Sequence, residues 1–289
     1  LASFERRRPM RAGSLIVTIY GDAIVPRGGS LWLGSLLDMM AGFGVEPGLV
    51  RTAISRLVAD GWFERTRIGK QSYYRLSAAR AFELEAATSR IYRGAEPAWS
   101  GEFEVAILTT GDTAERAARR ERMLREGYGQ AAANVMVRPK AGATSDSPAS
   151  LVSDAVAMVT HPQSAENARA LAQACWQLNA LDAAYRDFLK AFGPVADEIE
   201  AGARLADAQA FQLRTLLIHD WRRIVLRDPL LPRAMLPEDW PGFRALAVVA
   251  GIYRRALAGA ERWLDGHAVN EDGPLPEPAA ALAERFCTQ

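Results

Sequence analysis

Apolar positions in the first quarter of the chain change from a helical period to a strand-like alternation. The run SLIVTIYGDAI (14–24) predicts an apolar helix that ends at turn residues 26–29. Residues 31–40 and 46–63 repeat apolar positions at helical spacing on either side of a glycine-containing break. Residues 62–76 predict two short strands around a turn at Gly69 and Lys70. This order is typical of a winged helix-turn-helix, which we expect over 1–76.

The second helix of the predicted helix-turn-helix has two chemically different faces. Its apolar stripe consists of Leu49, Val50, Ala53, Ile54, Leu57 and Val58. Polar residues share the opposite face: Arg51, Thr52, Ser55 and Arg56. In a helix-turn-helix this face enters the major groove of DNA, where Arg bonds guanine O6 and N7, and Ser or Thr bonds phosphates or base edges. The alternative is a solvated face of an amphipathic helix.

Basic and polar residues also gather on the predicted hairpin. Five of them are expected to contact phosphates or the minor groove: Arg65, Arg67, Lys70, Gln71 and Tyr73. Arg6, Arg7, Arg8 and Arg11 form a further basic arm in the sequence. Residues 1–76 hold 11 Lys and Arg against 6 Asp and Glu, whereas the whole chain of 289 residues has a net charge of only +1. The basic excess favours a polyanionic partner for this part of the chain.

The remaining chain predicts three further parts and a tail. Residues 77–100 predict a linking helix. Strand-like runs and two helical segments over 101–173 follow a β-α-β…β-α order, which predicts a ferredoxin-like domain although no final strand is evident. Residues 174–270 predict a helical C-terminal domain. The proline-containing tail 271–289 is expected to be poorly ordered. The predicted fold class is therefore α+β.

Composition excludes several classes of protein. With 49% hydrophobic residues the chain is too apolar for a disordered protein, yet it has no apolar run near the ~20 residues of a membrane span. Cys175 and Cys287 stand alone, so a disulfide framework or a cysteine-rich zinc site is excluded. The first residues, LASFERRRPMRAG, lack the apolar segment of a secretory signal. We expect a cytoplasmic protein with no membrane partner.

Two long segments resemble one family of bacterial regulators. They are residues 14–76, with VRTAISRLVADGW and GKQSYYRL, and LRTLLIHDWRRIVLRDPLLPRAMLPEDWPG (213–242). Together with SRIYRG (89–94) and W-x-G-x-F (99–103), they resemble the PaaX family of repressors of phenylacetate degradation. The resemblance implies a winged helix that binds a palindromic operator, a central ferredoxin-like domain similar to a CRISPR adaptation nuclease, and a helical C-terminal domain. It also implies a homodimer that an aryl-CoA thioester, usually phenylacetyl-CoA, releases from DNA.

The second of these segments also permits a chemical interpretation. A CoA thioester needs cations for its phosphates and an apolar slot for its acyl group, and arginines alternate here with apolar residues. The candidate effector residues are Arg214, His219, Trp221, Arg222 and Arg223. The alternative is a core helix whose arginines form ion pairs and whose histidine is structural, and for His219 this alternative is favoured.

Enzymatic functions find little support in the sequence. Phosphate loops, strand-linked GxGxxG, HExxH and GxSxG are all missing, and the three histidines lie in separate segments. We therefore expect no catalytic residues, no metal and no cofactor. One alternative is a metal-dependent nuclease through Asp112, just after a predicted strand, but Asp112 is better explained as the cap of helix 113–127. Another alternative is an architectural DNA binder without an effector.

Overall fold

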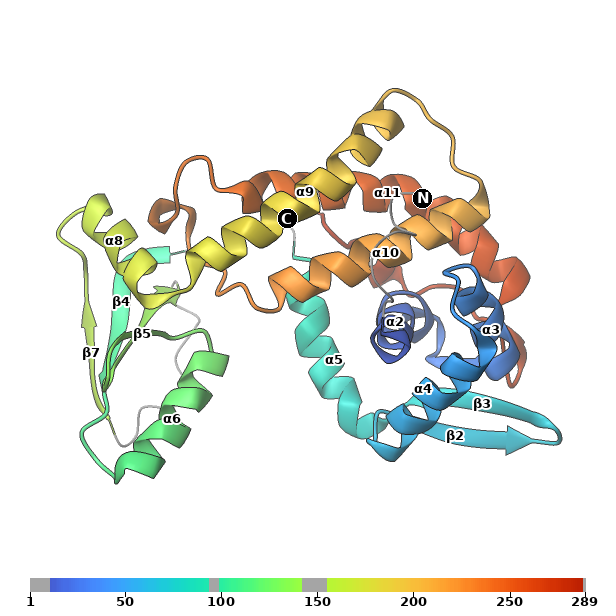
Figure 1. Cartoon of the computed structure of the whole chain (residues 1–289), viewed down its shortest axis with the longest axis horizontal. Coiled ribbons are helices and arrows are strands. Elements are labelled where there is room, and N and C mark those ends of the chain that lie inside the picture. The colour runs from blue at the N-terminus through green and yellow to red at the C-terminus, as the bar shows by residue number, and fades with distance from the viewer. Residues whose placement is uncertain (1–10, 94–98, 142–154, 288–289) are drawn as a thin grey trace. The chain divides into compact units, whose positions relative to one another are not determined.

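The computed structural model describes residues 11–93, 99–141 and 155–287, and it has α+β architecture (Figure 1). Contacts divide the chain into two compact units. The first unit consists of Leu1–Gly94, Phe188–Leu226 and Ala245–Gln289, and the second unit consists of Ala95–Asp187 and Arg227–Arg244. Neither unit is continuous in sequence, because helices from the C-terminal third of the chain contribute to both.

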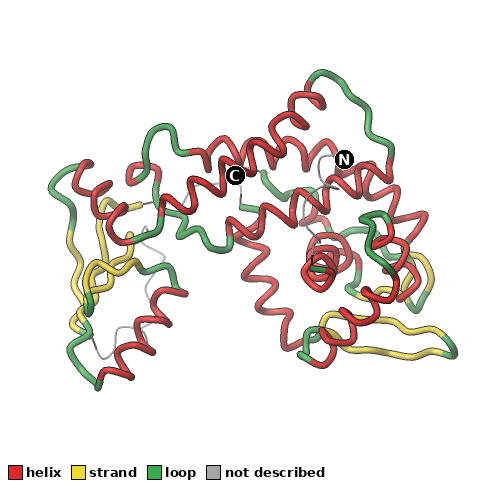
Figure 2. The backbone as a smooth tube through the Cα atoms, viewed as in Figure 1, coloured by secondary structure: helices red, strands yellow, loops and turns green. Residues whose placement is uncertain are grey.

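The N-terminal part of the first unit is a winged helix-turn-helix. Its elements are α2 (Ala12–Ile19), the π-helical turn η1 (Tyr20–Ile24), η2 (Val25–Arg27), β1 (Ser30–Trp32), α3 (Leu33–Ala41), α4 (Pro47–Ala59), β2 (Phe63–Ile68) and β3 (Gln71–Leu76). The three strands form an antiparallel sheet in the order β1-β3-β2. Figure 2 shows the β2–β3 hairpin projecting beyond the helices beside it.

Two details of this module differ from the sequence prediction. The helix expected over 31–40 begins at Leu33, because Ser30–Trp32 instead pairs with β3 as a strand. Gly28 (φ 91°) and Gly29 (φ 77°) immediately precede that strand, and their left-handed backbone is accessible mainly to glycine. On α4, Leu49 is 52% exposed, so the apolar stripe is narrower than predicted, with Val50 and Ile54 as its buried members.

C-terminal helices complete the core of the first unit. The chain outside the winged module contributes α5 (Ala78–Ile91), part of α9 (Leu178–Glu200), α10 (Asp207–Val225), most of α11 (Pro241–His267), β8 (Val269–Asn270), β9 (Gly273–Pro274) and η4 (Ala280–Leu282). Phe211 of α10 and Leu264 of α11 belong to the same buried cluster as Leu15 and Ile54 of the winged module. The structure thus differs from the separate domains expected over 1–76 and 174–270, because one hydrophobic core is shared between them.

The tail expected to be poorly ordered is packed over the described residues up to 287. Leu275 is buried in the core of the first unit, and Leu282 and Phe286 are also buried. Phe286 packs edge-on against Tyr92 and Tyr253, with ring centroids 5.4 and 5.2 Å away. The prediction for 271–289 is therefore wrong over the described residues, because apolar residues between and after the prolines supply buried contacts.

The second unit contains a four-stranded antiparallel sheet in the order β5-β6-β4-β7. Its elements are β4 (Trp99–Ile107), α6 (Thr113–Arg125), β5 (Gly129–Ala132), β6 (Val135–Ala141), β7 (Val156–Thr160), α8 (Ala165–Cys175) and η3 (Arg233–Met235). The strand directions and order are those of a split β-α-β arrangement, as a ferredoxin-like domain requires. The sequence pattern did not predict β5, a short strand whose residues have no alternating apolar pattern.

Candidate nucleic-acid interface

The second helix of the helix-turn-helix is α4, and its sequence explains how it is held in place. Pro47 occupies its first turn, where a missing N–H costs no helical hydrogen bond. Val50 and Ile54 are buried one turn apart and anchor the helix in the core that α2 and α3 also line. The helix therefore presents its opposite side outward as a rigid surface.

All four predicted residues of that outward side are exposed. Arg51, Thr52, Ser55 and Arg56 lie between and beside the two buried anchors, so one helical face brings them together. The Thr52 hydroxyl donates to the carbonyl of Gly48 at 3.0 Å, whereas the side chains of Arg51 and Arg56 make no hydrogen bond or ion pair with any described residue. Their guanidinium groups are thus available to an external acceptor.

The β2–β3 hairpin forms the wing and carries the second group of predicted residues. Its two-residue turn places Ile68 opposite Gln71, with Gly69 in a left-handed conformation (φ 59°). Arg65, Arg67, Lys70 and Gln71 are all exposed. The Arg65 guanidinium donates to the Ser72 hydroxyl at 2.9 and 3.2 Å, which holds this side chain across the strand pair. The wing is consequently a preformed basic surface.

Tyr73 differs from the other predicted contact residues. Its side chain is buried, with 7% relative exposure, and Tyr73 pairs with Trp32 and Thr66 in the sheet. Its hydroxyl donates to Gln71 Oε1 at 2.6 Å. The structure therefore makes Tyr73 a residue that orients Gln71, and not an exposed contact residue. Of the predicted basic arm, only Arg11 lies within the described residues, where it is exposed.

A connection between the sheet of the wing and the C-terminal segment was not predicted. Arg75 on β3 donates to Glu271 at 2.9 Å, and the hydroxyl of Ser30 on β1 donates to the same carboxylate. Burial alone would raise the pKa of Glu271, but the hydrogen bonds from Ser30 and Arg75 lower it overall. The carboxylate is therefore held ionised between two strands of the sheet. No sequence spacing indicates this link, because 196 residues separate Arg75 from Glu271.

Arg214, predicted to bind effector phosphates, lies in the interior. It is fully buried, and its Nε donates to Asp22 Oδ2 at 2.7 Å while Nη1 bonds Glu261. Arg285 donates to the same Asp22 carboxylate at 2.9 Å, and the hydroxyls of Tyr92 and Tyr253 donate to it at 2.6 and 3.0 Å. Burial alone would lower the pKa of Arg214, but the carboxylates of Asp22 and Glu261 raise it overall. The arginine is thus committed to an internal ion-pair cluster.

Three more of the predicted effector residues are similarly engaged. The Thr18 hydroxyl donates to Ser14, so the 3.0 Å bond between Thr18 Oγ1 and His219 Nδ1 requires the histidine to donate. Burial, together with the charges of Arg222 and Arg223, lowers the pKa of His219 to about 4.

Trp221 is buried and donates to the carbonyl of Ile91 at 2.8 Å, and Arg222 donates to Ser14. Only Arg223 is exposed. The five residues therefore do not line one open site.

Asp112, the residue of the nuclease alternative, caps α6. Its carboxylate accepts from the backbone N–H of Glu115 at 2.9 Å, and Glu115 accepts from the backbone N–H of Asp112 at 2.9 Å. The capping interpretation is thereby confirmed. Among the described side chains, no group of three or more His, Cys, Asp or Glu could hold a metal ion. None of the described helices has the length and apolarity needed to cross a membrane.

Comparisons with known proteins agree with this geometry. Residues 11–80 match the family described as PaaX-like protein, and residues 176–266 match PaaX-like protein C-terminal domain. The transcriptional repressor PaaX of Escherichia coli (strain K12) is 34% identical over 295 residues, covering 96% of this chain and 90% of that protein.

A solved structure, the uncharacterized protein Rv0674 from Mycobacterium tuberculosis, has a TM-score of 0.60 at 23% identity and covers 87% of this chain and 96% of its own. That likeness concerns the fold alone. The two family matches and the identity to the Escherichia coli protein show more: the chain belongs to the PaaX family.

Proposed function

We propose that this protein is a cytoplasmic transcriptional repressor of a phenylacetate degradation operon. The observation that carries the proposal is the exposed polar face of α4, where Arg51, Thr52, Ser55 and Arg56 stand opposite the buried anchors Val50 and Ile54. A related protein from Escherichia coli is named a transcriptional repressor. We assign no catalytic role to the chain.

In the proposed complex, α4 enters the major groove and the wing contacts the neighbouring backbone. Arg51 and Arg56 are the side chains able to fork onto guanine, and Arg65, Arg67 and Lys70 supply charge for phosphates. A homodimer would present two such helices to a palindromic operator, because the symmetry of the protein and of the site correspond.

The proposed effector is an aryl-CoA thioester such as phenylacetyl-CoA. A ligand can release DNA only if it binds more tightly to the form that does not fit the operator. The C-terminal segment is linked to the sheet of the wing through Arg75 and Glu271, so a change in that segment has a direct physical route to the DNA-contacting hairpin.

Fluorescence anisotropy of a labelled duplex from the promoter of the operon tests the proposal. We expect binding that scrambled DNA does not match, and that phenylacetyl-CoA reverses while phenylacetate and CoA do not. Specific binding that ignores the thioester would contradict the effector. Equal binding to scrambled DNA would contradict the repressor and favour an architectural DNA binder.

A further inference from the structure

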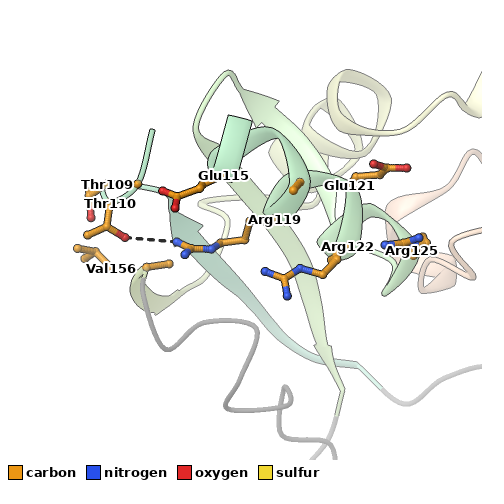
Figure 3. A pocket seen from close by; sticks show the side chains of 11 residues that line it. Thr109, Thr110, Glu115, Arg119, Glu121, Arg122, Arg125 and Val156 are labelled. Carbon is orange, nitrogen blue, oxygen red and sulfur yellow. Dashed lines mark hydrogen bonds between the residues drawn. The ribbon is translucent and has the colours of Figure 1, made fainter. Parts of the chain in front are cut away.

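A basic hollow in the second unit takes no part in the interface described above. It has a volume of about 1040 Å³ and lies between α6, the loop that follows β4, and the beginning of β7. Figure 3 shows Arg119 and Arg122 extending from α6 toward the same side, with Thr109, Thr110 and Val156 nearby. Its size lies at the upper end of the range for small-molecule pockets.

The arginines of the hollow form a row along one helix. Arg119, Arg122 and Arg125 are spaced by three residues, so their backbone positions rise by roughly 4.5 Å per step and roughly 9 Å in all. Guanidinium groups bind phosphate oxygens through paired hydrogen bonds. A row of this length suits a ligand that carries several separated phosphates better than a single small anion.

Two arginines of this row, Arg122 and Arg125, form no ion pair with the acidic residues of the lining, Glu115 and Glu121. Glu115 accepts from the backbone N–H of Asp112 at the start of α6, one helical turn before Arg119. Glu121 extends away from Arg119 and Arg122 in Figure 3. Within the described ranges, the side chains of Arg122 and Arg125 make no hydrogen bond or ion pair. Two neighbouring guanidinium groups that pair with no described carboxylate indicate a place for an external anion.

The other walls of the hollow add different chemistry. Thr109 and Thr110 offer hydroxyl groups beside Arg119, and Thr110 Oγ1 lies 3.3 Å from its guanidinium. Ala118, Ala155 and Val156 provide an apolar surface. A nucleic-acid strand would need a basic track that continues well beyond about 9 Å, since it carries a phosphate at every nucleotide. A compact molecule with a phosphorylated end and a less polar end fits the walls better.

We propose that this hollow binds the phosphorylated end of a small molecule, which on the proposed function is the 3′-phosphate and diphosphate of the CoA thioester effector. The inference rests on that proposed function for the identity of the ligand, whereas the arginine row supports the phosphate chemistry by itself. Arg119, Arg122 and Arg125 hold the phosphates, and the apolar wall contacts the remainder of the ligand.

Isothermal titration calorimetry of the full chain without DNA tests this site. The variant is Arg122→Gln/Arg125→Gln, and the matched control is Arg169→Gln/Arg244→Gln, which removes two exposed arginines of the same unit outside the hollow. The ligands are phenylacetyl-CoA, adenosine 3′,5′-bisphosphate and phenylacetate. We expect the variant to lose about 30-fold or more in affinity for both phosphorylated ligands, and the control to bind like wild type.

The outcomes separate the site from the proposed function. If wild type binds phenylacetyl-CoA and the variant binds it equally well, the site is overturned while the effector stands. If the bisphosphate binds through the arginines but the thioester does not bind at all, the site is supported and the effector is overturned. If neither phosphorylated ligand binds wild type, both are overturned. Loss of operator binding in the variant but not in the control would assign the hollow to nucleic acid and overturn the inference.

Discussion

The guanidinium group of Arg214 on α10 donates to the carboxylate of Asp22 at 2.7 Å, and both side chains are at most 2% exposed. Asp22 lies in the π-helical turn of the winged module, 192 residues away in sequence. Arg285 from the C-terminal segment bonds the same carboxylate at 2.9 Å. Three distant segments are therefore joined by one buried charge, and each depends on the others for its hydrogen bonds.

Removing the cation of this pair should destabilise the whole first unit. We expect Arg214→Met to lower the free energy of unfolding by about 3–5 kcal/mol, because Asp22 and Glu261 lose a buried counter-charge. Urea denaturation measures the change. Arg262→Met is the matched control, since Arg262 pairs with Asp207 at the surface and its loss should have little effect. Equal effects of the two variants would contradict the structural role of the cluster.

The C-terminal segment should contribute to stability in the same way. Phe286→Ala removes a buried ring that packs on Tyr92 and Tyr253, so we expect a loss of about 3 kcal/mol in the free energy of unfolding. Glu277→Ala changes an exposed residue of the same segment and serves as the control. A Phe286→Ala protein as stable as wild type in thermal and urea unfolding would mean that the tail is not packed in solution.

His219 should make stability depend on pH. Its pKa is about 4 in the folded chain against about 6.5 in an unfolded one, so the unfolded state binds more protons between these values. The contribution of His219 to the free energy of unfolding is therefore fully present above pH 6.5. It is lost as the pH falls toward 4, and the total loss is roughly 3 kcal/mol.

The variant His219→Asn keeps an N–H donor for Thr18, but its amide does not titrate in this pH range. Comparing urea unfolding of both proteins at pH 7 and pH 5 should show a smaller loss in the variant; an equal loss would contradict the assignment.

Local sequence patterns predicted the helices and turns of the winged module, but they did not identify contacts between residues that are distant in sequence. The period of Val50 and Ile54 predicted the orientation of α4, and the turn at Gly69 predicted the wing. Asp22 stands within an apolar helical run, but nothing in the spacing identified Arg214 or Arg285 as its partners. The effector hypothesis for Arg214 and His219 depended on composition, which does not distinguish a buried ion pair from an open site.

Tyr73 provides a test of the corrected interface. Its ring is buried and its hydroxyl acts only on Gln71 within the described contacts, at 2.6 Å. We expect Tyr73→Phe to change operator affinity less than threefold, because the charged groups that face DNA are retained. Gln71→Ala is the comparison variant, because it removes the side-chain amide that Tyr73 orients. A large loss in Tyr73→Phe with Gln71→Ala unaffected, measured by anisotropy, would restore Tyr73 as a direct contact.

Arg51 and Lys70 should have different roles in DNA binding. Arg51 projects from the outward face of α4, so Arg51→Ala should cost about 1–3 kcal/mol against the operator and less against scrambled DNA, reducing sequence preference. Lys70 lies at the tip of the wing, so Lys70→Ala should weaken binding to all DNA sequences to a similar extent. The slope of log affinity against log salt concentration should also fall by about 1, as expected for the loss of one phosphate contact. Anisotropy titrations at several salt concentrations separate the two effects. If both variants bind operator and scrambled DNA as wild type does, α4 and the wing are not the surfaces that contact DNA.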